Sequence, residues 1–124
     1  VGIQPTSPIR EKKDFDNSIK FFLKKKLDTL FSSSIIKDYF VWIDKKNKLV
    51  PNYNYKKRKV RQKITEKYLE NGSIYIFDKK KFLTTKCRLF GKIGTFVLDS
   101  FKKFQLDGKK DWIIVESILN SIKK

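Results

Sequence analysis

The sequence contains no histidine, no methionine and no alanine, and it has a single cysteine, Cys87, among 124 residues. Without histidine, a Ser-His-Asp triad and a zinc site built on histidine are excluded. One cysteine cannot form a disulfide within the chain. No apolar run approaches the ~18 residues of a membrane helix, and no signal peptide opens the chain, so we expect no membrane partner and a cytoplasmic location. Because the chain begins at Val1 and lacks methionine, we expect it to be part of a longer protein.

The composition is that of one folded domain with a strongly basic surface. Hydrophobic residues make up 40% of the chain and aromatic residues 15%, which is enough for a core. The net charge of +17 is typical of nucleic-acid binding. However, only four of the 30 basic residues are arginine, the residue whose bidentate fork clamps phosphates and reads bases. We therefore interpret most lysines as a solvated surface, and keep a lysine-rich nucleic-acid-binding module as a distant alternative.

The hydrophobic pattern indicates an α/β order of elements. It predicts a helix over Asp14–Leu30, ended by Ser32-Ser33-Ser34, then an extended segment Ile35–Ile43 and a polar turn Asp44–Asn47. Asn71-Gly72 predicts a turn into a strand Ser73–Phe77, followed by a short helix Lys79–Thr85 and strands Lys92–Leu98 and Phe104–Leu106. Asp107 is expected to cap a final helix whose inward stripe is Trp112, Val115, Leu119 and Ile122.

The stretch Lys48–Lys67 has no clean period and is densely basic, so we predict a loop or an arm that reaches away from the body. Residues 40–67 are the candidate arm.

Four separated stretches carry a resemblance to one family. They are Gln4-Pro5-Thr6-Ser7-Pro8-Ile9-Arg10; Arg58-x-x-Arg61-Gln62; Tyr68-x-Glu70-Asn71-Gly72-Ser73-Ile74-Tyr75-Ile76; and Leu106-Asp107-x-x-x-Asp111-Trp112-x-x-x-Glu116. In this order and spacing the chain resembles the C-terminal half of acylneuraminate cytidylyltransferases, the CMP-sialic acid synthetase family. The first and third stretches together are the most specific part of the resemblance.

The resemblance implies a Rossmann-like mixed-sheet nucleotidyltransferase, of the nucleotide-diphospho-sugar transferase type, with residues 1–124 as a partial domain and residues 40–67 as a dimerisation arm. Such enzymes transfer CMP from CTP to a nine-carbon sugar acid, release pyrophosphate and use Mg²⁺. Their CTP loop lies in a first half that nothing here matches, so we expect the isolated chain to be inactive. The implied partners are CTP, the sugar acid and a second copy of the chain. A cytidylyltransferase for legionaminic or pseudaminic acid is the alternative within this class.

The resemblance also implies roles for individual residues. Asp107 and Arg61 are the candidate catalytic residues, and Asp107 with Gln105 the candidate Mg²⁺ ligands. Gln105 stands where the family has a first aspartate, so this site has one carboxylate instead of two, which weakens the expected binding of a hard cation. The candidate substrate-binding residues are Gln4, Arg58, Gln62 and Asn71.

Each of these residues also has a plain structural interpretation. Asp107 can be no more than a helix cap, and Asn71-Gly72 no more than a turn. Gln4 can bond its own loop, and the arginines can be solvated charge. Cys87, flanked by Lys86 and Arg88, is interpreted as an ordinary thiol.

Overall fold

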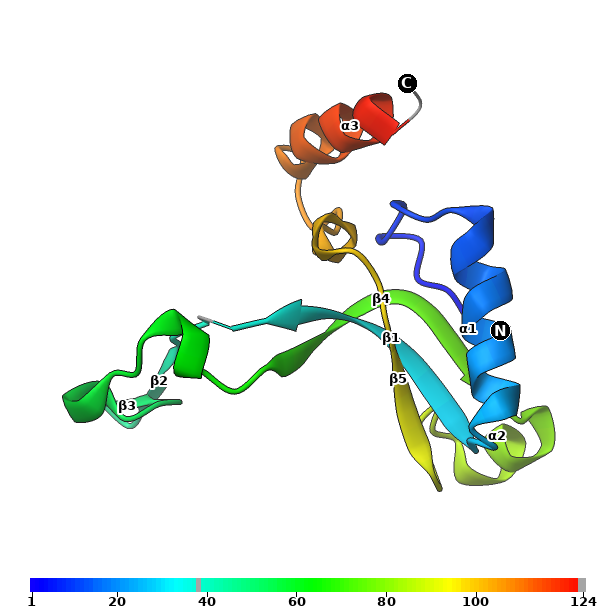
Figure 1. Cartoon of the computed structure of the whole chain (residues 1–124), viewed down its shortest axis with the longest axis horizontal. Helices are drawn as coiled ribbons and strands as arrows, with labels where there is room; N and C mark the ends of the chain where they lie inside the picture. The colour runs from blue at the N-terminus through cyan, green and yellow to red at the C-terminus, as the bar shows by residue number, and fades with distance from the viewer. Residues whose placement is uncertain (38, 123–124) are drawn as a thin grey trace.

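The protein is a small α/β domain with a mixed three-stranded sheet and a separate two-stranded hairpin (Figure 1). The computed structural model describes residues 1–37 and 39–122; Asp38, part of the predicted extended segment, lies outside the described residues. The central strand β1 (Thr29–Ile36) pairs antiparallel with β4 (Lys67–Phe77) and parallel with β5 (Ile93–Val97). Gly2 adds an isolated antiparallel bridge to Tyr75 on β4. None of the helices in the described part of the chain is long and apolar enough to cross a membrane.

Helix α1 (Lys12–Lys24) covers one face of this sheet and ends earlier than the hydrophobic period predicts. The backbone N–H of Glu11 donates to Asp14 Oδ2 (2.8 Å), which closes the first turn. At the other end Lys26 has φ of 49°, and the N–H of Leu27 reaches back to the carbonyl of Phe22. This is a left-handed helix ending without glycine, so the sequence gives no signal for it. The predicted continuation to Leu30 is wrong because Thr29 already begins β1.

The apolar core lies between α1 and the sheet. Leu30, Ile74 and Ile76 are buried at its centre. Phenylalanines from α1 and β5 pack around them, and Phe21 meets Phe96 edge to face at 5.7 Å between ring centroids. One face of the sheet therefore has a continuous hydrophobic layer.

The serine run that predicted a break is instead the middle of β1. Ser32, Ser33 and Ser34 are fully buried, because their hydroxyls find partners on the neighbouring strands. Thr95 on β5 donates to Ser33 Oγ (2.6 Å), and Ser32 Oγ accepts from the backbone of Ile74 on β4 (2.8 Å). The three serines therefore lie within the strand and do not end it.

Asn71-Gly72 is a bulge within β4, and the predicted turn ahead of a separate strand is wrong. From Phe31 to Ser33 on β1, the partner on β4 changes from Tyr75 to Glu70. Gly72 has φ of 68°, which supplies the left-handed residue that such an irregularity needs.

The candidate arm emerges between β1 and β4 and extends away from the sheet (Figure 1). It contains the hairpin strands β2 (Trp42–Lys45) and β3 (Lys48–Pro51), then two 3-10 turns, η1 (Tyr55–Lys57) and η2 (Arg61–Lys63). The predicted extended segment Ile35–Ile43 is thus divided between two strands of different sheets. The predicted polar turn is the hairpin turn, with Lys46 and Asn47 both left-handed.

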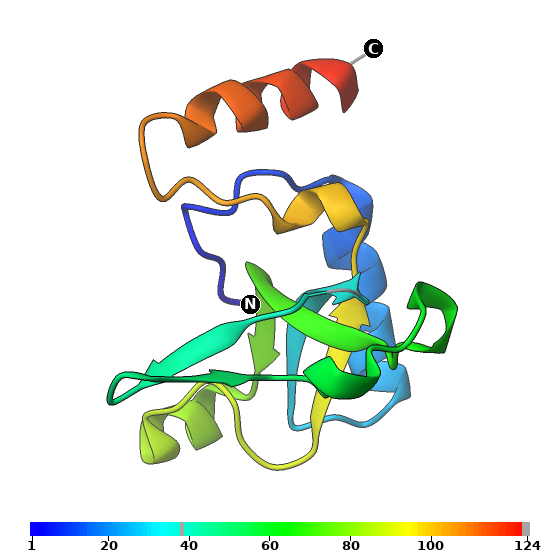
Figure 2. The same ribbon diagram turned by 90° about the vertical axis from the view of Figure 1, so that its left-hand side faces the viewer.

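After β4 the chain forms α2 (Lys79–Thr85), β5, the 3-10 helix η3 (Ser100–Lys103) and α3 (Asp111–Ile122). The short helix is confirmed, and the strand Lys92–Leu98 is confirmed within one residue at each end. The predicted strand Phe104–Leu106 is absent from the described sheets. In α3 Val115 is buried, but Trp112 (61% exposed) and Ile122 (37%) are not, so only part of the predicted inward stripe is confirmed. Figure 2 shows α3 above the N-terminal loop.

Candidate functional site

The N-terminal loop, residues 4–10, docks onto the bulge of β4. The N–H of Gln4 donates to the Gly72 carbonyl (3.2 Å), and Ser7 Oγ donates to the Asn71 carbonyl (2.9 Å). Arg10 Nη1 donates to the carbonyl of Ser73 (3.2 Å), and partial burial lowers the pKa of this guanidinium. Two stretches that are about sixty residues apart in the sequence therefore form one surface.

Gly72 is the point of closest approach between the loop and the bulge. A Cβ at this position would stand 2.0 Å from Gln4 Oε1 and 2.8 Å from Ser7 Oγ. The side chain of Gln4 thus lies directly over the bulge, at the edge of the sheet. This places the candidate substrate residue Gln4 beside Asn71.

The side chain of Asn71 points into the protein. It is fully buried; its Oδ1 accepts from Ser32 Oγ (2.6 Å), and its Nδ2 donates to Ser34 Oγ (3.3 Å). The same Oδ1 accepts from the Ser73 backbone (3.2 Å). These contacts give Asn71 a structural task, to hold the bulge against β1, while its substrate role stays a prediction.

The segment Phe104–Gly108 runs beside the N-terminal loop. The N–H of Leu106 donates to the carbonyl of Thr6 (2.8 Å). Leu106 separates Gln105, which is half-buried, from Asp107, which is exposed. The two candidate metal ligands therefore flank the residue that ties this segment to the loop.

Asp111, and not Asp107, closes the start of α3. Asp111 Oδ2 accepts from the backbone N–H groups of Asp107 (2.9 Å) and Gly108 (2.6 Å), and the helix begins at Asp111 itself. The predicted capping role of Asp107 is wrong. Within residues 1–37 and 39–122 the Asp107 carboxylate has no hydrogen bond or ion pair, so its oxygens are available to a ligand.

The segment carries two side chains with oxygen atoms of the kind that Mg²⁺ takes as ligands. Asp107 offers one carboxylate and Gln105 one amide oxygen, and Mg²⁺ commonly takes one or two carboxylates together with phosphate oxygens and waters. In the described part of the chain no group of three or more His, Cys, Asp or Glu residues is arranged to hold a metal. The protein residues alone do not form a closed metal centre there.

Next to this segment lies a buried charged cluster that the sequence does not reveal. Lys102 in η3 is 1% exposed, and its Nζ donates to Glu11 Oε2 (2.7 Å) and to Asp14 Oδ2 (2.7 Å) and Oδ1 (2.8 Å). Burial opposes the charge of Lys102, but the hydrogen bonds to Asp14 and Glu11 outweigh it and raise the pKa of the lysine. The bond to Lys102 lowers the pKa of Glu11. In a chain with 26 lysines, nothing in the local sequence singles out this one.

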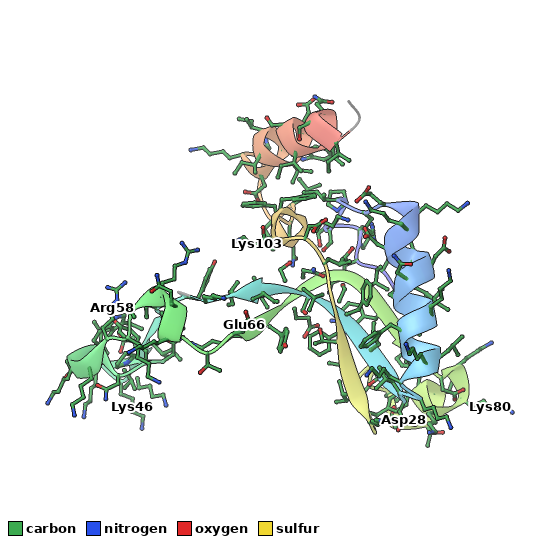
Figure 3. The ribbon with its side chains drawn as sticks, in the orientation of Figure 1. Asp28, Lys46, Arg58, Glu66, Lys80 and Lys103 are labelled. Atoms are coloured by element: carbon green, nitrogen blue, oxygen red, sulfur yellow. The ribbon has the colours of Figure 1, made fainter. Side chains whose placement is uncertain are left out.

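The arm holds the other candidate residues, Arg58, Arg61 and Gln62. The Arg58 guanidinium lies 4.1 Å from the ring centroid of Phe40, a cation–π contact. Arg58 and Arg61 line a cavity of about 350 Å³, and Gln62 is exposed on η2. In Figure 3 Arg58 lies out on the arm, away from Lys103 on η3.

Arg61 also faces the body of the protein. With Lys37 and Tyr39 at the base of the arm, and Ser100 and Lys103 of η3, it lines a second cavity of about 520 Å³. The candidate residues therefore form two groups. Gln4, Asn71, Gln105 and Asp107 lie at the sheet edge, while Arg58 and Gln62 lie on the arm; Arg61 is at the side of the arm that faces η3.

The chain shows a distant similarity to a known protein. No family model matches the chain. The chain is similar to post-translational flagellin modification protein B of Campylobacter coli. The two are 28% identical over 122 residues, which is 96% of this chain and 52% of the relative. The chain thus spans about half the length of the relative, and a similarity at this level assigns no specific activity to it.

Proposed function

We propose that this chain forms the C-terminal half of a cytidylyltransferase that transfers CMP from CTP to a nonulosonic acid. The observation that carries the proposal is the docking of residues 4–10 onto Asn71-Gly72, with the segment that bears Asp107 tied to the same loop. Three stretches on which the family resemblance rests thereby meet at one edge of the sheet. In α/β proteins ligands commonly bind outside the carboxyl ends of the strands, and the bulge is bonded to Ser34 in the second half of β1.

The residues at this edge have the chemistry that the reaction requires. The amide of Gln4 can both donate to and accept from the hydroxyl and acyl groups of a sugar acid. Asp107, assisted by Gln105, would hold Mg²⁺, whose charge stabilises the phosphate oxygens during transfer. Arg58, Arg61 and Gln62 would bind the carboxylate of the sugar acid or a phosphate, and the exposed arm would bring them to the site of a second subunit.

The name of the relative is compatible with the product of the proposed reaction but does not distinguish between the sugar acids. Its name attributes to it a modification of flagellin. A glycosylation of flagellin would consume an activated sugar, which is the product of the proposed reaction. Legionaminic and pseudaminic acid are therefore tested beside N-acetylneuraminic acid.

The test uses the protein expressed from its complete gene, incubated with CTP, Mg²⁺ and each sugar acid in turn. We expect formation of a CMP-sugar with stoichiometric pyrophosphate, measured by chromatography and a coupled pyrophosphate assay. Absence of a CMP-sugar with all three acids contradicts the proposal. The 124-residue chain alone is expected to be inactive, since positioning of the α-phosphate accounts for much of the rate of such reactions.

A nucleic-acid-binding role is the second candidate, and the arm is the observation that favours it. Trp42 (43% exposed) and Tyr55 (54%) lie among exposed lysines. Stacking residues within a basic surface are typical of single-strand binding. Fluorescence polarisation with single-stranded oligonucleotides decides between the roles: a steep log–log dependence on salt supports this one.

A further inference from the structure

Lys102 is a buried lysine whose ammonium group is surrounded by carboxylates. Its Nζ forms bonds of 2.7 to 2.8 Å to Glu11 and Asp14, and Asp99 Oδ2 lies 3.9 Å away. Asp14 is itself buried, with 5% of its surface exposed. The cluster joins η3 to the first turn of α1, and Figure 2 shows these two elements side by side.

The cluster is one of two ties between the same pair of segments. At one end Lys102 is bonded to Glu11 and Asp14; at the other the N–H of Leu106 is bonded to Thr6 (2.8 Å). In the part of the chain that the structure describes, residues 103–105 make no hydrogen bond to residues 4–14. Loss of either tie would leave the segment free to shift along the loop.

The loop against which this segment is fixed is itself immobilised. Gln4 and Ser7 are bonded to the backbone of the bulge in β4, as described above. Glu11 follows this loop directly in the chain, and Arg10 Nη1 also donates to the carbonyl of Ser73 (3.2 Å). Lys102 is therefore bonded to a segment that β4 holds in place.

A buried ion cluster contributes little to net stability compared with an apolar core, since desolvation offsets most of the Coulomb attraction. Its geometric effect is stronger, because two carboxylates on one ammonium group admit few alternative arrangements. We propose that Lys102 is a positioning residue, which fixes the segment bearing Gln105 and Asp107 in register with the Gln4–Arg10 loop. The importance of that register for catalysis rests on the proposed function.

The test compares variants of the protein expressed from its complete gene. Lys102→Met removes the charge and preserves the length of the side chain. The double variant Lys102→Met/Asp14→Asn also removes the unpaired buried carboxylate, and so separates loss of position from loss of stability. Lys102→Arg is the rescue. Lys13→Met is the matched control, since Lys13 pairs with the same Glu11 (3.1 Å) but is 65% exposed.

We expect the double variant to recover most of the melting temperature that Lys102→Met loses, while kcat for cytidylyl transfer stays about 10- to 100-fold below the wild type. The loss should fall mainly on kcat and less on KM for CTP, because the CTP loop is expected outside this chain. Hydrogen exchange at Leu106 should be faster in both Lys102→Met variants. Lys102→Arg should restore the rate at least in part. Lys13→Met should change neither kcat nor hydrogen exchange at Leu106.

If kcat recovers together with the melting temperature in the double variant, Lys102 has only a structural role and the inference is wrong. If the wild-type protein transfers no CMP, the proposed function fails. Hydrogen exchange at Leu106 then tests by itself whether Lys102 fixes the position of the segment. Unchanged exchange in Lys102→Met overturns the inference in that case also.

Discussion

Gly72 has a left-handed backbone conformation in the bulge of β4, and the side chain of Gln4 lies over it. We expect Gly72→Ala to lower the free energy of unfolding by about 1–2 kcal/mol, since a non-glycine residue at φ of 68° is strained. The new Cβ must also displace Gln4 Oε1, which lies 2.0 Å from its position. Urea denaturation measures the loss. The control is Gly108→Ala, whose Cβ would meet its nearest neighbour, Asp111 Oδ2, at 3.7 Å; an equal loss there would contradict the argument.

Asp107 and Asp111 lie close in sequence but have different tasks. Asp111 accepts two backbone N–H groups at the start of α3, so Asp111→Asn should lower stability by up to about 1 kcal/mol. Asp107 makes no such bond, so Asp107→Asn should leave the melting temperature unchanged and lower the rate of CMP transfer at limiting Mg²⁺. Thermal denaturation and the transfer assay on both variants are the measurements. Equal losses of rate would mean that Asp107 has no metal role.

Tyr75 provides a prediction for alkaline pH. Burial, followed by the hydrogen bond from its hydroxyl to Glu70, raises the pKa of Tyr75 to about 12. The folded state therefore favours the neutral phenol. This contribution to stability is complete below pH 10, the pKa of an unfolded tyrosine, and is lost as pH rises from 10 to 12. The stability difference between wild type and Tyr75→Phe should shrink by about 1 kcal/mol between pH 8 and pH 11, as measured by urea denaturation; a constant difference would contradict it.

Single residues also mark what the sequence could not predict. The resemblance assigned Gln4 and Asn71 to the same substrate site, and the structure places them side by side. The inward orientation of Asn71 was not predicted, because its partners Ser32 and Ser34 belong to a run that suggested a helix end. Lys102 could not be predicted, because its burial depends on Glu11 and Asp14, about ninety residues earlier in the chain.

At the scale of elements, local signals predicted α2 but failed where distant strands decide the structure. α2 is preceded by Asp78, whose side chain accepts from the backbone of Lys81 (2.9 Å), and its bounds were predicted. The end of α1 was missed because Leu27 and Leu30 continue the helical period into a turn and a strand. The conformation of β1 depends on hydroxyl partners from both neighbouring strands, which no local pattern contains.

The hairpin of the arm offers a prediction about one turn. Lys46 (φ of 54°) and Asn47 (φ of 63°) occupy the two central positions between β2 and β3. Both must be left-handed, a requirement that Asn-Gly meets best. The double variant Lys46→Asn/Asn47→Gly should therefore slow hydrogen exchange in β2 and β3, by an amount corresponding to about 0.5–1 kcal/mol. Exchange in β1 serves as the internal control, and faster exchange in the hairpin would contradict the turn geometry.

At the scale of the whole molecule, the arm extends away from the sheet (Figure 1). Its aromatic residues contact one another, with Phe40 4.5 Å from Tyr53 and Trp42 5.5 Å from Tyr55 between ring centroids. These rings therefore find part of their apolar contact within one subunit. Even so, Tyr39 (51%), Trp42 (43%) and Tyr55 (54%) remain well exposed. An arm that keeps this much aromatic surface in water has a surface suited to a partner.

We predict that the protein expressed from its complete gene is a homodimer through this arm. Sedimentation at micromolar concentration should show the dimer, more stable at moderate than at low salt, because the basic arms repel each other when salt does not screen them. Trp42→Ser on the arm should weaken dimerisation about tenfold or more, as expected for an aromatic residue at the centre of an interface. Trp112→Ser is the matched control, since Trp112 is 61% exposed on α3, outside the arm. A clean monomer in the wild type, or equal weakening by both substitutions, would rule out the arm as the interface.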